Sequence, residues 1–346
     1  MVTVVELERS LVSLGIDLDD VLPYHALLSI LQAPGPHAFT RDEAERTAAL
    51  LAAELGAHDA ASFPVAAFLA WWREQLGGAC YVGSHAARGA PSHMEDRSLA
   101  CALPGGGRGA LAAVLDGHGG HACAQFGAAR LLAAVLATPA YGGRRYEEAL
   151  SQAILHLNDS FLAEHADDLS GSTLCAVLRM DEYLYIANVG DSRAVLRTSS
   201  AECIQLTVDH SPDDAAELAR IWEAGGDTFD AEDGQGSRVV APDNVSMVAC
   251  SRSIGDRAFK AMSPPYVPAT PDVSSRLISE TDHFIVIASD GVWDVCPNKR
   301  ACDVVAECLG QGGTPMAAAE ALCNEASKRR SEDNISVVVM LLNECH

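Results

Sequence analysis

The sequence predicts an α+β fold, because short apolar runs of strand length occur beside longer segments with helical periodicity. One run, 111–115, is apolar throughout and ends at a carboxylate and a glycine-rich turn, as a buried strand does. Segment 146–165 places its apolar residues at helical spacing, which suits a helix buried on one side. The chain has 346 residues, 49% of them hydrophobic, which is ample for a core and predicts about two domains.

The strand predicted over 111–115 is followed directly by Asp116, and glycines surround the nearby His118. Glycines let the backbone approach a ligand closely. An acid and a histidine on a tight turn after a buried strand point to metal or acid/base chemistry. Carboxylates also end strands simply as turn formers, so this turn alone leaves both interpretations open. A helix is predicted to follow over 121–136.

Three further predicted strands adjoin an aspartate. They are 183–189 before Asp191, 283–288 before Asp290, and 335–342 after Asp333. In an antiparallel sheet the start of one strand lies beside the end of its neighbour, so these carboxylates and Asp116 would gather at one edge. Glu95 and Asp96 add two more acids after a short loop rich in Gly, Ala and Pro.

So many carboxylates at one place repel one another and cannot all stay ionised. Mg²⁺ and Mn²⁺ resolve the conflict, because they prefer oxygen ligands and retain several waters. Two such ions that share a carboxylate can lower the pKa of a bridging water and orient a phosphoryl group. The residues alone therefore favour a carboxylate-bridged metal hydrolase.

A series of short motifs, in order, resembles the metal-dependent Ser/Thr protein phosphatases of the type 2C family. The motifs lie at 94–96, 116–120, 170–173, 189–193, 206–210, 251–256, 288–294 and 331–334. The resemblance implies a four-layer α/β/β/α sandwich of two antiparallel sheets flanked by helices. It also implies hydrolysis of phosphoserine and phosphothreonine in phosphorylated protein substrates.

Carried over residue by residue, the resemblance implies a binuclear Mg²⁺ or Mn²⁺ centre bridged by Asp116. The remaining implied roles are Glu95 and the Gly117 carbonyl on one ion, Asp290 and Asp333 on the other, Asp191 and Asp294 on a third, weaker ion, and Asp96 orienting bound waters. His118 would be the general acid that protonates the departing Ser or Thr oxygen. A metal-activated water would attack phosphorus in line, so no phosphoenzyme is expected.

One departure from the family pattern concerns substrate phosphate. Pro91 stands where the family usually has the arginine that grips the phosphate, three residues before the Met-Glu-Asp motif. Arg88 is the nearest upstream candidate for phosphate binding, because an altered loop would bring it back to the site. An arginine fork matches phosphate better than a lysine does, so its loss weakens substrate binding more than the chemistry.

Other candidates are interpreted as structural. Ser211 stands where the family has a lysine, and with Pro212 after it we expect Ser211 to be the N-cap of a helix over 213–223. Trp222 in that helix is expected in the core, and His210 is interpreted as structural rather than as a ligand.

Two further motifs need an interpretation. Arg252, Gly255 and Asp256 are expected to shape a loop, with a direct substrate role as the alternative. Cys323 and Arg329 have the spacing of a cysteine-dependent phosphatase, but the segment around them looks helical and Ala-rich, whereas that site requires a phosphate-binding loop.

Composition narrows the partners. A net charge of −23 argues against nucleic-acid backbones and anionic membrane surfaces as partners. The 11 cysteines are odd in number and lack CxxC spacing, which fits reduced thiols in the cytoplasm or nucleus. No apolar stretch reaches membrane-spanning length. We expect a monomer that acts on phosphoproteins.

Residues 1–75 lie outside the resemblance, which leaves 76–346 as the predicted phosphatase domain. Helices are predicted over 5–14, 41–55 and 64–76. Segment 56–72 faintly resembles the second half of an EF-hand, with Phe63 at the apolar loop position but without side chains able to bind Ca²⁺. The alternatives are a helical extension and a degenerate EF-hand that serves as a packing module.

Three functions remain open from the sequence. The leading one is an active metal-dependent phosphoprotein phosphatase. A catalytically weak phosphatase-like scaffold is the second, but none of the expected metal-binding acids is missing. A phosphatase of small phosphorylated metabolites is the third, because the substrate groove is not legible in the sequence.

Overall fold

The computed structural model describes residues 21–23, 62–64, 81–103, 109–230 and 236–343. The chain divides into one unit of residues 79–102 and 108–346 and a second of residues 1–78 and 103–107. In the second unit, β1 (Val21–Pro23) and β2 (Ser62–Pro64) pair antiparallel. The helices predicted over 5–14 and 41–55 lie outside the described residues. So does the helix predicted over 64–76, except for Pro64, which ends β2.

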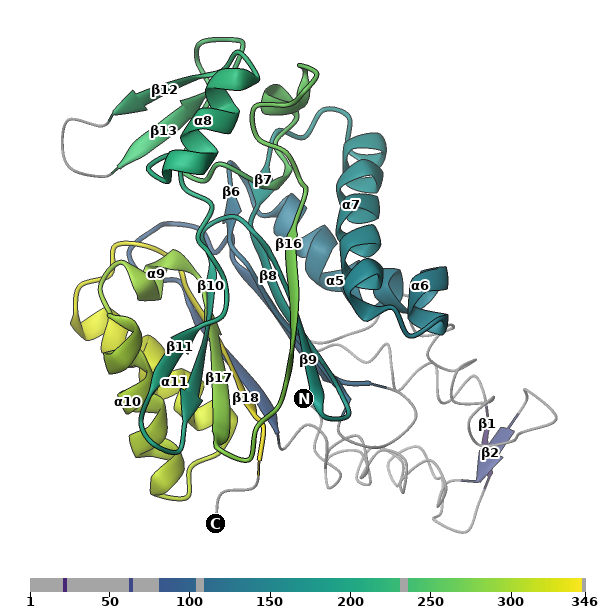
Figure 1. The fold of residues 1–346 in the computed structure, drawn as a ribbon, viewed down its shortest axis with the longest axis vertical. Helices are drawn as coiled ribbons and strands as arrows, with labels where there is room; N and C mark the ends of the chain where they lie inside the picture. Colours follow the sequence, from purple (N-terminus) through teal and green to yellow (C-terminus); the bar gives the residue numbers. More distant parts are fainter. Residues whose placement is uncertain (1–20, 24–61, 65–80, 104–108, 231–235, 344–346) are drawn as a thin grey trace. The chain divides into compact units, whose positions relative to one another are not determined.

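The larger unit is built on two five-stranded antiparallel sheets (Figure 1). The first sheet contains, in order, β11 (Cys203–Gln205), β10 (Arg193–Thr198), β17 (Asp282–Ala288), β18 (Ile335–Leu341) and β3 (Val82–Ala87). The second contains β16 (Asp272–Leu277), β9 (Tyr183–Val189), β8 (Leu174–Met180), β5 (Ala110–Leu115) and β4 (Arg97–Ala102). Four strands predicted from apolar runs are confirmed as β5, β9, β17 and β18, each within a residue of its expected ends.

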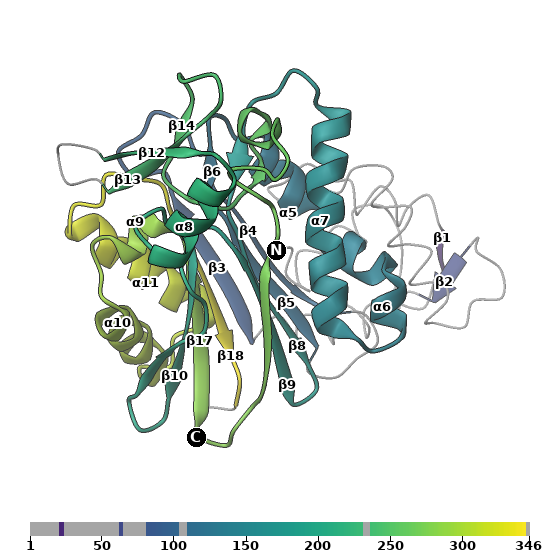
Figure 2. The same ribbon diagram turned by 45° about the horizontal axis from the view of Figure 1, so that its top comes forward.

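Helices cover the outer faces of the two sheets (Figure 2). They are α5 (Ala122–Ala137), α6 (Pro139–Gly142) and α7 (Tyr146–Glu164) beside the second sheet, and α9 (Asp290–Trp293), α10 (Asn298–Gly310) and α11 (Pro315–Lys328) beside the first. In α7 the residues Ala149, Ala153 and Leu157 recur at helical spacing and are buried, as the one-sided apolar pattern predicts. The four-layer α/β/β/α fold is confirmed.

The core has two layers because central strands such as β5 and β17 bury both of their faces. Ile285 and Ile287 of β17 pack with Ala112 and Val114 of β5 in a cluster between the sheets. Val286, whose side chain points the other way, packs with α10 and α11. Side chains alternate along a strand, so a strand covered on both sides is apolar throughout. This explains the continuous apolar runs in the sequence.

A smaller element lies between β11 and β16. It contains α8 (Ala215–Glu223), β12 (Asp227–Asp230), β13 (Ser237–Val240), β14 (Met247–Val248) and the short helix η1 (Arg257–Lys260). Two predictions about α8 are wrong. Asp214 rather than Ser211 is the N-cap, because its carboxylate accepts hydrogen bonds from the backbone N–H groups of Ala216 and Glu217.

Trp222 is the second error, since it is 59% exposed rather than part of the core. Its neighbour Ile221 is fully buried and packs against Val239 and Val248 of the small sheet. Consecutive helical residues differ by about 100° in direction, so only one of the two can face the core.

Among the described residues, none of the helices has the length and apolar character to cross a bilayer.

Candidate functional site

The edge of the two sheets brings the predicted acids together. Arg97 pairs with Leu115, so Asp96 and Asp116 lie beside each other just beyond β4 and β5. In the first sheet Ala288, the last residue of β17, pairs with Val337 near the start of β18. Asp290 therefore follows the end of β17 close to Asp333, which precedes β18. Antiparallel pairing brings the two acids of each sheet together, and the two pairs are close enough that the charges of Asp290 and Asp333 act on Asp116.

The carboxylates raise one another's pKa. Burial raises the pKa of Asp116 well above its ordinary value, and the charges of Asp96, Asp290, Asp191 and Asp333 raise it further. Burial likewise raises the pKa values of Asp96 and Asp191, to about 6 each. The pKa of Asp290 is raised well above its usual range by burial and then by Asp191 and Asp333. Burial and mutual repulsion therefore dominate the electrostatics of this cluster.

Two oxygens of this cluster have no hydrogen-bond donor. Oδ1 of Asp96 and Oδ1 of Asp290 are buried and unpartnered within the described ranges. Oδ2 of Asp96 does have a partner, since Ser289 Oγ donates to it at 2.9 Å. A buried carboxylate oxygen without a donor is costly unless a cation compensates for it. Unpartnered oxygens and mutual repulsion fit hard divalent cations.

The described side chains do not by themselves complete a coordination shell. No group of three or more His, Cys, Asp or Glu side chains in this part of the chain converges closely enough to form one. Mg²⁺ sites usually use one or two carboxylates and keep several waters, so an all-protein cage is not required. The acid set therefore suits Mg²⁺ or Mn²⁺ rather than Zn²⁺, whose structural sites are closed.

Backbone and hydroxyl contacts fix the acid-bearing turns. The Asp116 N–H donates to Thr173 Oγ1 at 3.0 Å, and this oxygen lies 2.7 Å from Ser192 Oγ beside Asp191. The Glu95 N–H donates to Asn334 Oδ1 at 2.7 Å. These bonds join turns that are far apart in sequence, so the acids occupy set positions before any ion binds.

The remaining predicted ligands lie around the same edge. A Cβ at Gly117 would lie 2.5 Å from the carbonyl oxygen of Glu95, so only glycine lets these two backbones approach. Asp290 is the first residue of α9, and Asp294 lies one helical turn later, directly after the helix. The side chain of Asp294 is exposed. Burial and the charge of Asp333 raise the pKa of Asp294, which extends the acidic cluster outward.

Arg88 lies beside this edge and is exposed. Its Nη1 donates to the carbonyl oxygen of Ser92 at 3.2 Å, across the loop that contains Pro91. Its own carbonyl oxygen accepts from Asn334 Nδ2 at 2.7 Å, next to Asp333. The loop thus holds the Arg88 backbone against the acid cluster and leaves the guanidinium at the surface.

His118 contacts Asp256, which was expected only to shape a loop. Its Nε2 lies 2.8 Å from Oδ2 of Asp256, whose side chain is 4% exposed. The general interpretation of Asp256 as loop-shaping missed this contact. The only sequence signal was the combination of a carboxylate and a histidine in two separate family-like motifs, and spacing alone cannot show that they meet.

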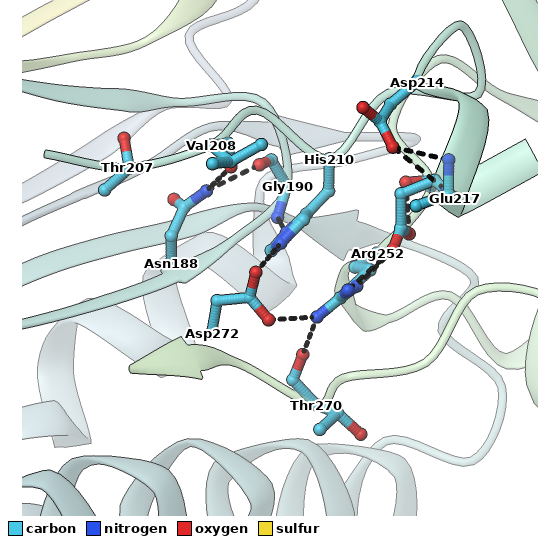
Figure 3. Close-up of polar contacts among 12 residues, drawn as sticks. Asn188, Gly190, Thr207, Val208, His210, Asp214, Glu217, Arg252, Thr270 and Asp272 are labelled. Atoms are coloured by element: carbon cyan, nitrogen blue, oxygen red, sulfur yellow. Dashed lines mark hydrogen bonds and ion pairs between the residues drawn. The ribbon is translucent and has the colours of Figure 1, made fainter. Parts of the chain in front are cut away.

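A row of ion pairs connects Glu217 of α8 with His210 (Figure 3). Both carboxylate oxygens of Glu217 accept from guanidinium groups, Oε1 from Arg252 at 2.6 Å and Oε2 from Arg220 at 2.9 Å. Arg252 also donates to Oδ1 of Asp272 at 2.7 Å, and Oδ2 of Asp272 lies 3.1 Å from Nε2 of His210. The row ends at His210.

His210 then anchors the turn that contains Asp191. The N–H of Gly190 donates to Nδ1 of His210 at 3.1 Å, and the N–H of His210 donates to the Gly190 carbonyl oxygen at 2.9 Å. His210 is 1% exposed, and burial lowers its pKa, as does the charge of Arg252. Its structural interpretation is confirmed.

The cysteine-phosphatase spacing has no matching geometry. Cys323 lies inside α11 and is 1% exposed. Its thiol donates to the backbone carbonyl oxygens of His85 at 3.6 Å and Ile335 at 3.9 Å, and the side chain packs in the apolar cluster under α10 and α11. A helix interior cannot form a phosphate-binding loop around this sulfur, so the helical expectation is confirmed.

Comparisons with known proteins agree on one family. A sequence model described as Protein phosphatase 2C matches residues 81–335. The chain is 43% identical over 175 residues to Probable protein phosphatase 2C 68 of Oryza sativa subsp. japonica, covering 50% of this chain and 45% of that protein. It is 33% identical over 247 residues to Probable protein phosphatase 2C 57 of the same organism, covering 68% and 63%. The chain thus spans less than two thirds of the length of these two relatives.

A solved structure agrees with the fold. The serine-threonine phosphatase 2C from Toxoplasma gondii superposes with a TM-score of 0.69 at 20% sequence identity, covering 76% of this chain and 94% of that one. At this identity the likeness concerns the fold, which matches the two sheets and their flanking helices.

Proposed function

This chain belongs to the protein phosphatase 2C family, and from that premise we propose that it is a metal-dependent phosphatase of phosphoserine and phosphothreonine in proteins. The observation that carries the proposal is the cluster of Asp96, Asp116, Asp191 and Asp290, whose pKa values are all raised. A protein would not retain so costly a cluster for stability alone. Bound cations would offset the repulsion between these carboxylates and bind the substrate phosphate.

The proposed ligands are those that the family resemblance implies. Asp116 would bridge two ions of Mg²⁺ or Mn²⁺, and Asp96 would orient their waters. The other proposed ligands are Glu95 and the Gly117 carbonyl on one ion, Asp290 and Asp333 on the other, and Asp191 with Asp294 on a third, weaker ion. When bound, the ions would supply a nucleophilic water at neutral pH and neutralise charge on the phosphoryl group.

Two further side chains would act on substrate. The guanidinium of Arg88 would bind the phosphoryl oxygens from the outer side of the site, where it is exposed. Nδ1 of His118 has no hydrogen-bond partner in the described part of the chain, and it would donate a proton to the departing Ser or Thr oxygen. When the bond between phosphorus and the Ser or Thr oxygen breaks, the dephosphorylated side chain would then leave as a neutral hydroxyl.

The proposal also covers the domain organisation, the cellular compartment and the oligomeric state. Residues 76–346 would form the phosphatase domain and 1–75 a separate helical or EF-hand-like extension, in line with the division of the chain near residue 78. The described cysteines are all free, which suits the cytoplasm or nucleus. We propose that the protein acts as a monomer.

The test compares a phosphothreonine peptide with glycerol phosphate, each with and without Mn²⁺. Release of phosphate mainly from the peptide, and only with Mn²⁺, supports the proposal. Faster release from glycerol phosphate would instead mark a metabolite phosphatase, and no release from either substrate would mark a scaffold.

Asp290 and Asp282 supply a matched pair of variants, because they lie at opposite ends of β17. Asp290→Asn should abolish Mn²⁺-dependent release. Asp282→Asn removes a buried carboxylate that binds Arg276 about 20 Å along the strand, so it should leave the kinetics unchanged.

A further inference from the structure

His118 lies in one outer strand of a small sheet beside the acid cluster, and Asp256 directly follows the other outer strand. This sheet has the order β15 (Ile254–Gly255), β7 (Gly171–Ser172) and β6 (Gly117–His118). In its register His118 pairs with Gly171, and Gly171 pairs with Gly255. Asp256 directly follows β15, so its side chain must cross the central strand to reach His118.

Gly171 leaves the space in which they meet. A Cβ at residue 171 would overlap both the Asp256 carboxylate and Nε2 of His118. The φ angle of Gly171 is not in the left-handed region, so an alanine there would strain no backbone dihedral and would act only through this overlap. The absence of a side chain at 171 is therefore what allows the contact.

Asp256 is itself held on several sides. Ser253 Oγ donates to Oδ2 of Asp256 at 2.5 Å, and the Asp256 N–H donates to the carbonyl oxygen of Ser170 at 3.1 Å. The N–H of Gly255 donates to Asn158 Oδ1 at 3.1 Å, which fixes β15 to α7. Asp256 adopts a left-handed φ of 51°. A residue held this firmly can orient a partner.

We propose that Asp256 is the positioning residue of His118: its carboxylate accepts the Nε2 hydrogen and thereby presents Nδ1 to the substrate. A buried carboxylate bonded to one ring nitrogen fixes both the tautomer and the plane of an imidazole.

The kinetic role rests on the proposed phosphatase function, and two variants test it. Asp256→Asn keeps the shape of the side chain and removes its charge. Gly171→Ala keeps both partners and forces them apart. Each should lower kcat for a phosphothreonine peptide by about 10- to 100-fold, part of the total that general acid catalysis supplies, with KM within about twofold. p-Nitrophenyl phosphate, whose leaving group needs little protonation, should lose far less.

Matched controls separate positioning from general damage. Asp282→Asn removes another buried, ion-paired carboxylate, and Gly142→Ala adds a methyl where no atom lies within 4 Å. Both should leave kcat unchanged. In the His118→Ala background, Asp256→Asn should have no further effect on kcat. Equal losses on both substrates, or an equally large loss in the His118→Ala background, would overturn the proposal.

NMR spectroscopy tests the contact between His118 and Asp256 without any measurement of activity. In long-range ¹H–¹⁵N spectra of the metal-free protein, the His118 ring is identified among the 12 histidines by its absence in His118→Gln. Wild type should carry a proton on Nε2 that exchanges slowly with water, and Gly171→Ala should lose that protection. A ring protonated on Nδ1 alone, or the same spectrum in both proteins, would refute the contact. If wild type releases no phosphate, the proposed function fails, whereas the spectrum still decides whether Asp256 positions the ring.

Discussion

The ion-paired Glu217 should contribute substantially to stability, and its contribution can be calculated. Burial raises the pKa of Glu217, but hydrogen bonds from Arg252, Arg220 and Ser251 outweigh that effect and hold the pKa at about 2, against 4.5 for an unperturbed glutamate. At about 1.4 kcal/mol per pKa unit, this difference corresponds to about 3 kcal/mol of folding free energy. The carboxylate is 5% exposed, so little of this is lost to solvent screening.

The sign of the pH dependence follows from the lowered pKa. The stabilisation is fully present above the unfolded-state pKa of 4.5 and disappears as pH falls through the folded-state pKa of about 2. Glu217→Gln should therefore lower the free energy of unfolding by about 3 kcal/mol at neutral pH, and by about half as much near pH 3.

Urea unfolding followed by circular dichroism measures both values. Glu223→Gln, in the exposed last residue of the same helix, is the matched control and should change stability by less than about 0.5 kcal/mol. A loss below about 1 kcal/mol for Glu217→Gln at neutral pH, or a loss that does not depend on pH, would refute the reasoning.

Three further predictions concern activity. His118→Ala should slow hydrolysis of phosphothreonine peptides by about 10²–10⁴-fold in kcat and that of p-nitrophenyl phosphate much less, and equal losses would mean another role for His118. Arg88→Ala should raise KM by an amount equivalent to about 1.5–3 kcal/mol, with Arg88→Lys recovering only part of it, whereas an unchanged KM would exclude phosphate binding by Arg88. Cys323→Ser should leave kcat and KM as in wild type, and an inactive but folded variant would revive the cysteine mechanism.

The strands and the acid cluster were predictable because the signals are local. Strands buried on both faces are apolar throughout, so β5 and β17 stand out in the sequence. Within each sheet, antiparallel pairing places the end of one strand beside the start of its neighbour, and the acids of the two sheets meet because β5 and β17 pack face to face. The sheet arrangement itself came from the family resemblance, since apolar runs do not specify which strands pair.

Errors arose where a side chain's environment depends on distant residues. Trp222 looked like a core residue by type, but the orientation of α8 is set by Ile221 packing on β13 and β14. Ser211 and Asp214 both have the side-chain type of an N-cap near this helix start, and Asp214 is the cap because its carboxylate accepts hydrogen bonds from two backbone N–H groups. The contact of His118 with Asp256 depends on the register of three short strands, which no local pattern encodes.

The central claim is that the carboxylates around Asp116 form the metal centre on which phosphate hydrolysis depends. The most direct measurement is phosphate release from a phosphothreonine peptide by exhaustively chelated wild type and Asp116→Ala, before and after Mn²⁺ is added back. Chelated wild type should be inactive and should recover with Mn²⁺, whereas Asp116→Ala should stay inactive because the shared ligand is gone. Activity that survives complete chelation, or an Asp116→Ala variant that Mn²⁺ restores, would contradict the account.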